Sequence, residues 1–179
     1  SVFILRGYAG TGKTSLVGAL VRVMQEMKRH VVLLAPTGRA AKVFSHHAGT
    51  PAFTIHKAIY RQQTFNGEDT RFGLGYNKHQ GTLFIVDEAS MIATGDGGSK
   101  MFGSGSLLED LLRLVFEAEN CKIIFVGDTA QLPPVGEDES PALRAETMRY
   151  YGMEVYEADL TEVVRQDAQS GVLHNATQL

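Results

Sequence analysis

Apolar residues gather in four short runs along the chain, each bounded by glycine, proline or polar residues. The runs are residues 2–6, 31–35, 82–86 and 121–126. Runs of this length that are rich in valine, isoleucine and phenylalanine are typical of buried strands. The stretches between them repeat apolar residues every three or four positions, which predicts helices. Alternating strands and helices predict an α/β domain with a mostly parallel sheet, right-handed crossovers and helices on both faces.

The first predicted helix follows the strand at 2–6. Its apolar residues at helical spacing are Leu16, Leu20, Met24 and Met27, and we expect it to run to about Arg29. Polar residues that can cap a helix stand before four later stretches: Thr37 before 40–44, Thr54 before 55–60, Ser106 before 107–115, and Ser140 with Pro141 before a helix to about Tyr150. Glu109 completes a capping box with Ser106.

Two segments lack a regular pattern. Residues 61–81 are polar and rich in glycine, which predicts a long loop or an irregular hairpin. Its aromatic residues Phe72 and Tyr76 either stack on nucleic-acid bases or belong to a solvated surface excursion. Residues 92–105 have the composition of a flexible linker. Beyond 150 the pattern predicts short extended pieces at 155–156 and 160–161 and a helical tail through 172–173.

Composition narrows the class of protein. The chain of 179 residues fits one domain, its apolar runs are too short to cross a membrane, and it shows no signal-peptide pattern, so we expect a soluble cytoplasmic protein. Cys121 has no partner for an internal disulfide and is expected to serve packing. Six histidines and one cysteine give no zinc-ligand spacing, so we expect no structural zinc. A net charge of −3 means that any nucleic-acid contact must come from a local cluster.

The sequence from Gly7 to Thr14 reads G-x-x-x-x-G-K-T, the phosphate-binding P-loop. It lies between a predicted strand and a predicted helix, as that loop requires. Backbone N–H groups and the helix dipole attract phosphate, the Lys13 ammonium reaches the terminal phosphates, and the Thr14 hydroxyl can bind Mg²⁺. The expected phosphate-binding residues are Gly7, Ala9, Gly10, Thr11, Gly12, Lys13, Thr14 and Ser15.

Two further strand ends carry residues suited to nucleoside triphosphate hydrolysis. Asp87 follows the strand at 82–86 and is a candidate metal ligand, while Glu88 is the candidate base for the attacking water. The alternative is a pair of surface acids at a strand end. Gln131 lies in the loop after the fourth strand, where its amide can bind both the γ-phosphate and water.

Six segments together resemble a known family. They are residues 7–14, 35–41, 54–56, 86–90, 127–135 and 160–166. In this order they resemble the motifs of superfamily-one DNA helicases of the RecD-like branch. Many ATPases share the P-loop and the acidic pair, whereas the strings P-T-G-R-A-A and G-D-x-x-Q-L-P-P-V are far more specific. The resemblance covers nearly the whole chain, 1–179, as a single RecA-like ATP-binding domain.

The resemblance implies an ATP-driven motor that moves along single-stranded DNA, usually 5′ to 3′, with Mg²⁺ as cofactor. It implies that Arg165 approaches the γ-phosphate, the alternative being a surface charge, and that Gln131 couples nucleotide state to DNA. Residues that match the DNA-backbone positions of the family are Thr37, Gly38, Arg39, Thr54 and His56. For His56 the alternative is a purely structural histidine.

Family members complete their catalytic site with a second RecA-like domain of the same polypeptide, and these residues contain no match to it. The segment that reads adenine before the P-loop strand has no match either, so ATP preference follows from the resemblance alone. We therefore expect the first motor domain of a longer helicase. A translocase attached to a nuclease or relaxase and a vestigial nucleotide-binding module are the alternatives. The second is disfavoured because Lys13, Asp87, Glu88 and Gln131 are all present.

Overall fold

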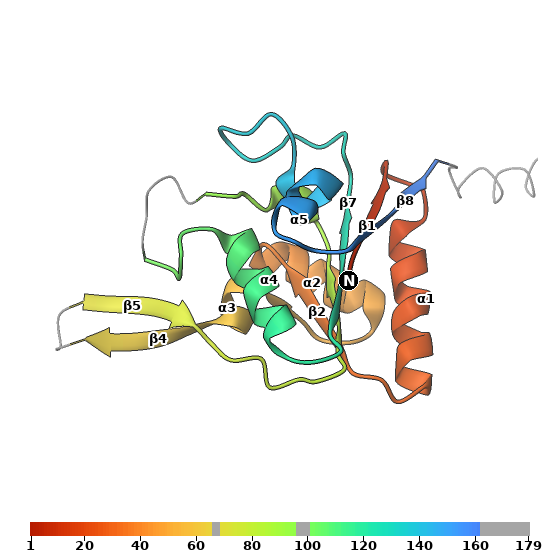
Figure 1. Cartoon of the computed structure of the whole chain (residues 1–179). Coiled ribbons are helices and arrows are strands. Elements are labelled where there is room, and N and C mark those ends of the chain that lie inside the picture. The colour runs from red at the N-terminus through yellow and green to blue at the C-terminus, as the bar shows by residue number, and fades with distance from the viewer. Residues whose placement is uncertain (66–68, 96–100, 162–179) are drawn as a thin grey trace, which may run out of the picture.

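The computed structural model describes residues 1–65, 69–95 and 101–161. Its centre is a sheet of six strands in the order β3-β2-β6-β7-β1-β8 (Figure 1). The strands are β1 (Val2–Gly7), β2 (Val31–Ala35), β3 (Ala52–Thr54), β6 (Leu83–Val86), β7 (Lys122–Gly127) and β8 (Val155–Leu160). Every pair of neighbours in this sheet is parallel. The predicted α/β class is therefore confirmed.

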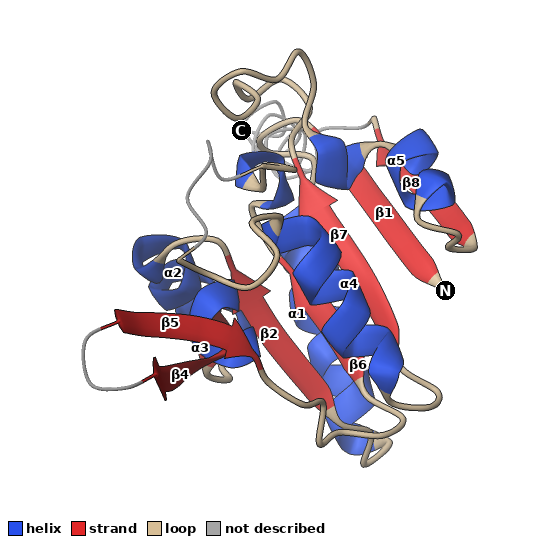
Figure 2. Cartoon of the chain, turned by 60° about the vertical axis from the view of Figure 1, so that its left-hand side comes forward, coloured by secondary structure: helices blue, strands red, loops and turns tan. Residues whose placement is uncertain are grey.

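Helices cover both faces of the sheet (Figure 2). On one face lie α1 (Lys13–Glu26) and α2 (Gly38–Ala48). The opposite face carries α3 (Ile55–Ile59), α4 (Leu107–Glu117) and α5 (Ala145–Tyr150), with the 3₁₀ turns η1 (Ala89–Met91) and η2 (Pro141–Leu143). Each face has its own apolar core, because side chains of a strand alternate between the two sides. The central strand β6 is buried throughout, as its unbroken apolar sequence predicts.

Three predicted caps begin their helices. The Thr37 hydroxyl oxygen accepts a hydrogen bond from the backbone N–H of Ala40 at 3.1 Å, which starts α2. Thr54 accepts the N–H of Lys57 at 3.2 Å and starts α3. Ser106 does the same for α4, whose first turn also carries acidic side chains that favour the helix dipole.

The predicted apolar face of α1 is correct for two of its four residues, since Leu20 and Met24 pack against the core. Val17 and Val21 are buried, whereas Leu16 and Met27 are 47% and 61% exposed. The covered face of the helix is therefore centred on Val17 and Val21, about one residue along from the predicted one. The helix also ends at Glu26 rather than near Arg29, because Lys28 takes a left-handed conformation and the N–H of Arg29 turns back to the carbonyl of Met24.

The helix predicted from Ser140 to Tyr150 is broken in two. Residues Pro141–Leu143 form the 3₁₀ turn η2, and α5 begins only at Ala145. Arg144 between them is extended, and its guanidinium pairs with Glu139 at 2.8 Å. Ser140 makes no capping hydrogen bond.

The segment at 61–81 is more regular than predicted. Strands β4 (Tyr60–Phe65) and β5 (Asp69–Leu74) form an antiparallel hairpin that projects away from the main sheet (Figures 1 and 2). Part of the 92–105 segment joins it, since Phe72 exchanges backbone hydrogen bonds with Met101 and Gly103. Phe72 packs against Phe102 with ring centroids 4.8 Å apart, while Tyr76 is 80% exposed.

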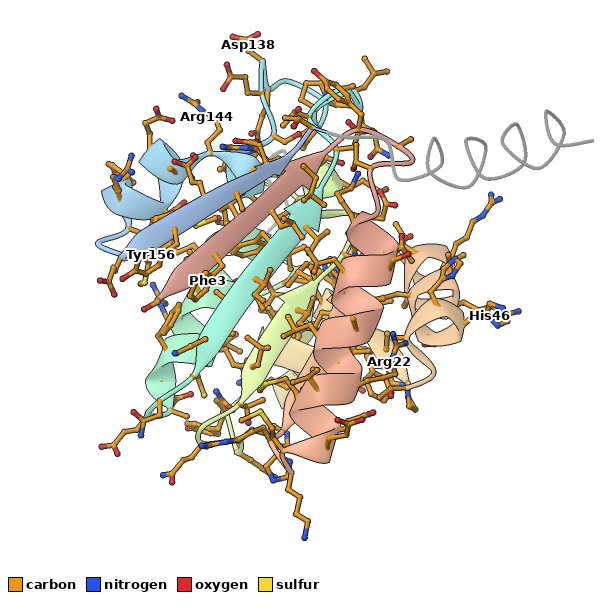
Figure 3. The ribbon with its side chains drawn as sticks, turned by 90° about the vertical axis from the view of Figure 1, so that its right-hand side faces the viewer. Phe3, Arg22, His46, Asp138, Arg144 and Tyr156 are labelled. Atoms are coloured by element: carbon orange, nitrogen blue, oxygen red, sulfur yellow. The ribbon has the colours of Figure 1, made fainter. Side chains whose placement is uncertain are left out.

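Two strands at the edges of the sheet were not predicted as such. β3 is only three residues long, and β8 is one continuous strand where two short extended pieces were expected. β8 pairs with β1 along its whole length, and Tyr156 stacks on Phe3 at this edge of the sheet (Figure 3). The predicted helical tail at 172–173 lies outside the described residues. None of the described helices is both long and apolar enough to cross a bilayer.

Candidate nucleotide-binding site

The carboxyl ends of β1, β6 and β7 surround a cavity of about 510 Å³. Predicted site residues on its wall are Ala9, Gly10, Gly12, Lys13, Thr14, Ser15, Asp87, Glu88 and Gln131. His47 and Asp128, which were not predicted, also line it. The fold thus brings together residues up to 122 positions apart in sequence, from Ala9 to Gln131, because parallel strands end at the same edge of the sheet.

The P-loop is shaped by its glycines and by Thr11. Gly10 and Gly12 have φ values of 83° and 90°, which residues other than glycine rarely adopt. Thr11 is buried beneath the loop and donates its hydroxyl proton to the carbonyl of Tyr8 at 2.7 Å. At Gly7 a Cβ atom would lie 2.6 Å from the Thr11 hydroxyl oxygen, so that only glycine fits. Gly7 and Thr11 therefore support the loop from behind.

Lys13 lies across the loop. Its ammonium donates hydrogen bonds to the carbonyl oxygens of Gly7 and Tyr8, the second at 2.9 Å. These are neutral acceptors, which a phosphate oxygen can replace with a stronger, charge-assisted bond. Burial raises the pKa of Asp87 and of Glu88, and the nearby Lys13 ammonium opposes part of that rise at both carboxyls.

Asp87 and Glu88 follow the buried strand β6. Burial raises the pKa of Asp87, and the N–H of Glu88, which donates to Asp87 Oδ1 at 2.9 Å, opposes that rise. Burial and the neighbouring Asp87 raise the pKa of Glu88, while a hydrogen bond from the Gln131 side chain lowers it. Glu88 has a φ of 52°, in the left-handed region, which costs about 1–3 kcal/mol for such a residue and is found mostly at functional sites.

Gln131 connects this pair to the next loop. Its Oε1 accepts a hydrogen bond at 2.8 Å from the hydroxyl of Ser90, which is completely buried. The loop is further shaped by Asp128, whose Oδ1 accepts the N–H of Ala130 at 2.8 Å. The sequence analysis gave Ser90 no role of its own, although a polar residue between the apolar Ala89 and Met91, two positions after Glu88, was a signal.

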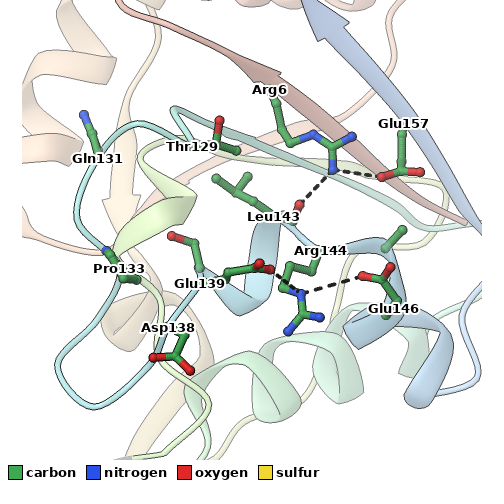
Figure 4. Close-up of a pocket in the computed structure, with 12 residues that line it drawn as sticks. Arg6, Thr129, Gln131, Pro133, Asp138, Glu139, Leu143, Arg144, Glu146 and Glu157 are labelled. Carbon is green, nitrogen blue, oxygen red and sulfur yellow. Dashed lines mark hydrogen bonds and ion pairs between the residues drawn. The ribbon is translucent and has the colours of Figure 1, made fainter.

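A second cavity, of about 420 Å³, lies on the other side of this loop (Figure 4). Gln131 lines both cavities, so its loop forms the wall between them. The second cavity is lined by ion pairs: Arg6 bonds Glu157 at 2.8 Å, and Arg144 bonds Glu139. Arg6 also donates to Asp159, which fixes β8 against β1.

The residues matched to DNA contacts lie at the neighbouring edge. Thr37 follows β2 and Thr54 ends β3, and these strands pair with Ala35 opposite Thr54. Gly38 and Arg39 are exposed in the first turn of α2. Both threonine hydroxyl oxygens accept capping bonds, so their protons are directed away from the helix N–H groups. Arg165 lies outside the described residues.

His56 belongs to an aromatic cluster. Its ring lies 5.0 Å from Phe102 and 5.6 Å from Tyr60, which in turn contacts Phe102 at 5.3 Å. The Tyr60 hydroxyl donates to Asp110 Oδ2 at 2.6 Å, and the N–H of Ser104 donates to the same oxygen at 3.0 Å. The sequence analysis missed this network, although an aspartate inside the apolar stripe of α4, Asp110, was a signal for it.

Asp87 and Thr14 line the nucleotide cavity together, and a carboxylate with a hydroxyl matches the oxygen ligands that Mg²⁺ prefers. Within the described ranges there is no group of three histidine, cysteine or acidic side chains that forms a complete metal cage. Mg²⁺ rarely occupies such cages and is more often bound by one or two carboxylates together with phosphate oxygens. The donor set therefore fits that ion.

Comparison with known proteins adds independent support. The sequence profile of a family described as the AAA domain matches residues 1–179. The ATP-dependent RecD2 DNA helicase of Deinococcus radiodurans is 34% identical over 133 residues, covering 74% of this chain and 16% of that protein. The ATP-dependent DNA helicase dda of Enterobacteria phage T4 is 28% identical over 167 residues, covering 92% of this chain and 35% of its own length.

The crystal structure of Pif1 helicase from Candida albicans has the same fold, with a TM-score of 0.55 and 21% identity, over 93% of this chain and 37% of that one. This chain thus spans only a minor part of each of these relatives. The profile match covers every residue, and the parallel sheet has the P-loop at the end of its β1 strand. The chain therefore belongs to the AAA-domain family of P-loop ATPases, as a RecA-like domain of the superfamily-one helicase type.

Proposed function

We propose that this chain is the first motor domain of an ATP-dependent DNA helicase, which couples ATP hydrolysis to movement along single-stranded DNA in the 5′ to 3′ direction. The observation that carries the proposal is the convergence of three strand ends on one cavity. The P-loop, the pair Asp87 and Glu88, and Gln131 all line it. These are the phosphate, metal, water and γ-phosphate contacts that hydrolysis requires.

Each residue has a role that follows from its chemistry. The P-loop N–H groups and Lys13 bind the phosphate chain, because the loop presents donors and the ammonium is held at its mouth. Thr14 and Asp87 would hold Mg²⁺, which when bound neutralises phosphate charge. Glu88 orients and deprotonates the attacking water. Its raised pKa makes it a stronger base than an ordinary carboxylate.

The DNA strand passes the edge formed by β2 and β3 in this proposal. Thr37, Thr54 and the backbone at Gly38 offer uncharged donors, and Arg39 offers a full positive charge. These groups suit phosphate oxygens, which carry no base information, and a chain with a net charge of −3 needs such a local contact.

We also propose that a second RecA-like domain of the same polypeptide covers the exposed side of the Gln131 loop. Leu132 and Val135 are 90% and 104% exposed, which is unusual for apolar side chains beside a polar cavity. Pro133 and Pro134 between them stiffen the loop, so that the apolar tips have a fixed position. By the resemblance to superfamily-one helicases, Arg165 would approach the γ-phosphate.

The experiment is Glu88→Gln in the full-length protein, with ATP turnover measured at saturating single-stranded DNA. The amide keeps the shape of the side chain and removes the base, so we expect nucleotide binding to persist and turnover to fall by about 10²- to 10⁴-fold. Glu26→Gln, at the exposed end of α1, is the matched control and should leave turnover unchanged. A decrease below about tenfold would exclude Glu88 as the base.

Unwinding assays then separate a helicase from a translocase that does not open duplexes. A duplex with a 5′ single-stranded tail should be opened, and one with a 3′ tail should not. ATP turnover stimulated by DNA without opening of either substrate would instead favour a non-unwinding translocase.

A further inference from the structure

Ser90 is a buried polar side chain with no assigned role. It lies two positions after Glu88, in the middle of η1, and has no exposed surface. Its hydroxyl donates to Oε1 of Gln131, which is 41 residues away in sequence and mostly exposed. A buried hydroxyl needs such a partner, because leaving it unpaired costs free energy. In this case the partner is the proposed γ-phosphate contact.

The hydrogen bond fixes which end of the Gln131 amide faces the cavity. An amide has one acceptor oxygen and one donor nitrogen, so an oxygen held by Ser90 leaves the nitrogen to donate elsewhere. The Gln131 side chain also opposes the rise in the pKa of Glu88 that burial causes, as a donor near that carboxyl would. Ser90 therefore holds Gln131 by its oxygen and leaves its donor nitrogen for the cavity that Glu88 also lines, where the γ-phosphate and water would lie.

The backbone around Ser90 holds it close to the loop. A Cβ atom on Gly127, at the end of β7, would lie 3.3 Å from the backbone nitrogen of Ser90 and 2.8 Å from Leu143. A side chain at 127 would therefore crowd this approach of β7 to η1. In the turn itself, the N–H of Met91 donates to the carbonyl of Glu88. Ser90 thus occupies a rigid position relative to both Glu88 and the start of the Gln131 loop.

We propose that Ser90 is a positioning residue for ATP hydrolysis, which acts by orienting the Gln131 side chain. Ser90 does not touch the nucleotide; it presents the donor end of Gln131 to the reacting groups. The inference rests on the proposed function, because it requires Gln131 to act in turnover.

A double-mutant cycle in the full-length protein tests this. ATP turnover at saturating single-stranded DNA is measured for wild type, Ser90→Ala, Gln131→Ala and the double variant. The loss of one hydrogen bond to a neutral group should lower kcat by roughly threefold to tenfold in Ser90→Ala, with nucleotide KM unchanged. In the Gln131→Ala background the same substitution should change kcat by less than about 1.5-fold, because its target is gone.

Ser45→Ala is the matched control, since Ser45 also donates its hydroxyl proton within the protein, to the carbonyl of Ala41 at 2.8 Å, and lies in α2. It should leave kcat unchanged. Thermal unfolding of each variant verifies that it is folded at the assay temperature.

Two results would overturn this inference and leave the proposed function intact. One is a wild-type kcat in Ser90→Ala, and the other is an equal loss in both backgrounds, which would mean that Ser90 acts independently of Gln131. If the wild-type protein shows no DNA-dependent ATP turnover, both the proposed function and this inference are wrong. The two failures are therefore distinguishable.

Discussion

Tyr60→Phe probes the buried network at the base of the β4–β5 hairpin. The substitution removes one hydroxyl and keeps the aromatic ring that packs against His56 and Phe102. Tyr60 is 5% exposed and Asp110 is 1% exposed, so water cannot easily replace the lost donor. The variant therefore measures the contribution of a single buried hydrogen bond to a carboxylate.

The magnitude follows from the geometry. At 2.6 Å the bond is short, as expected when the acceptor is charged. Hydrogen bonds to charged groups contribute about 1.5–3 kcal/mol to folding, so we expect Tyr60→Phe to lower the free energy of unfolding by about 2 kcal/mol. For a domain of this size that corresponds to a decrease in Tm of about 4–8 °C. The N–H of Ser104 still donates to Asp110, which prevents a larger loss.

Chemical denaturation at pH 7 provides the measurement. The chain has no tryptophan, so circular dichroism at 222 nm is the suitable signal. Tyr76→Phe is the matched control, because Tyr76 is 80% exposed and its substitution should change stability by less than about 0.5 kcal/mol. If the two variants lose the same amount, the hydroxyl of Tyr60 does not stabilise the fold through Asp110, and the network is only a packing arrangement.

Three shorter predictions follow from charges. Lys13→Ala should abolish most Mg²⁺–nucleotide binding in calorimetric titration, because the ammonium supplies the positive charge within the P-loop; equal affinity would exclude that role. Arg39→Ala should weaken single-stranded DNA affinity for all sequences and lower the slope of log affinity against log salt by about 0.7, whereas Thr54→Ala should weaken affinity without changing the slope. Asp159→Asn should destabilise the fold at pH 7 and not near pH 2. Arg6 holds the pKa of that carboxyl below its usual range, so the contribution is present above about pH 4 and disappears as pH falls through the lowered pKa. A difference in thermal unfolding that persisted at pH 2 would contradict this.

The central strands and several caps could be predicted because their causes are local. Four apolar runs each gave a strand, and Thr37, Thr54 and Ser106 each bond an N–H three residues away. Sequence spacing alone determines such contacts. The phosphate loop was predictable for the same reason, since eight consecutive residues carry its chemistry.

The errors have non-local causes. The buried row of α1 depends on where α2 and the sheet lie, and both of its apolar rows have helical spacing. β8 has mostly exposed side chains and therefore no apolar pattern, yet β1 pairs with every residue of it. Tyr60 and Asp110 are 50 residues apart, and Ser90 and Gln131 are 41 apart. No local signal predicts either partner.

The strand order explains how one sheet can link the two proposed ligands. β3 and β2 lead into the threonines that are proposed to contact DNA, β1 leads into the P-loop, and β6 and β7 lie between them. Asp87 and Glu88 follow β6, and Gln131 follows β7. The two central strands therefore end in the residues proposed for hydrolysis, between the proposed DNA edge and the P-loop. Ser90 joins these two strand ends through one hydrogen bond to Gln131. Because Gln131 and Glu88 line the same cavity, a displacement of the Gln131 loop changes the surroundings of the proposed base directly, without movement of the buried strands.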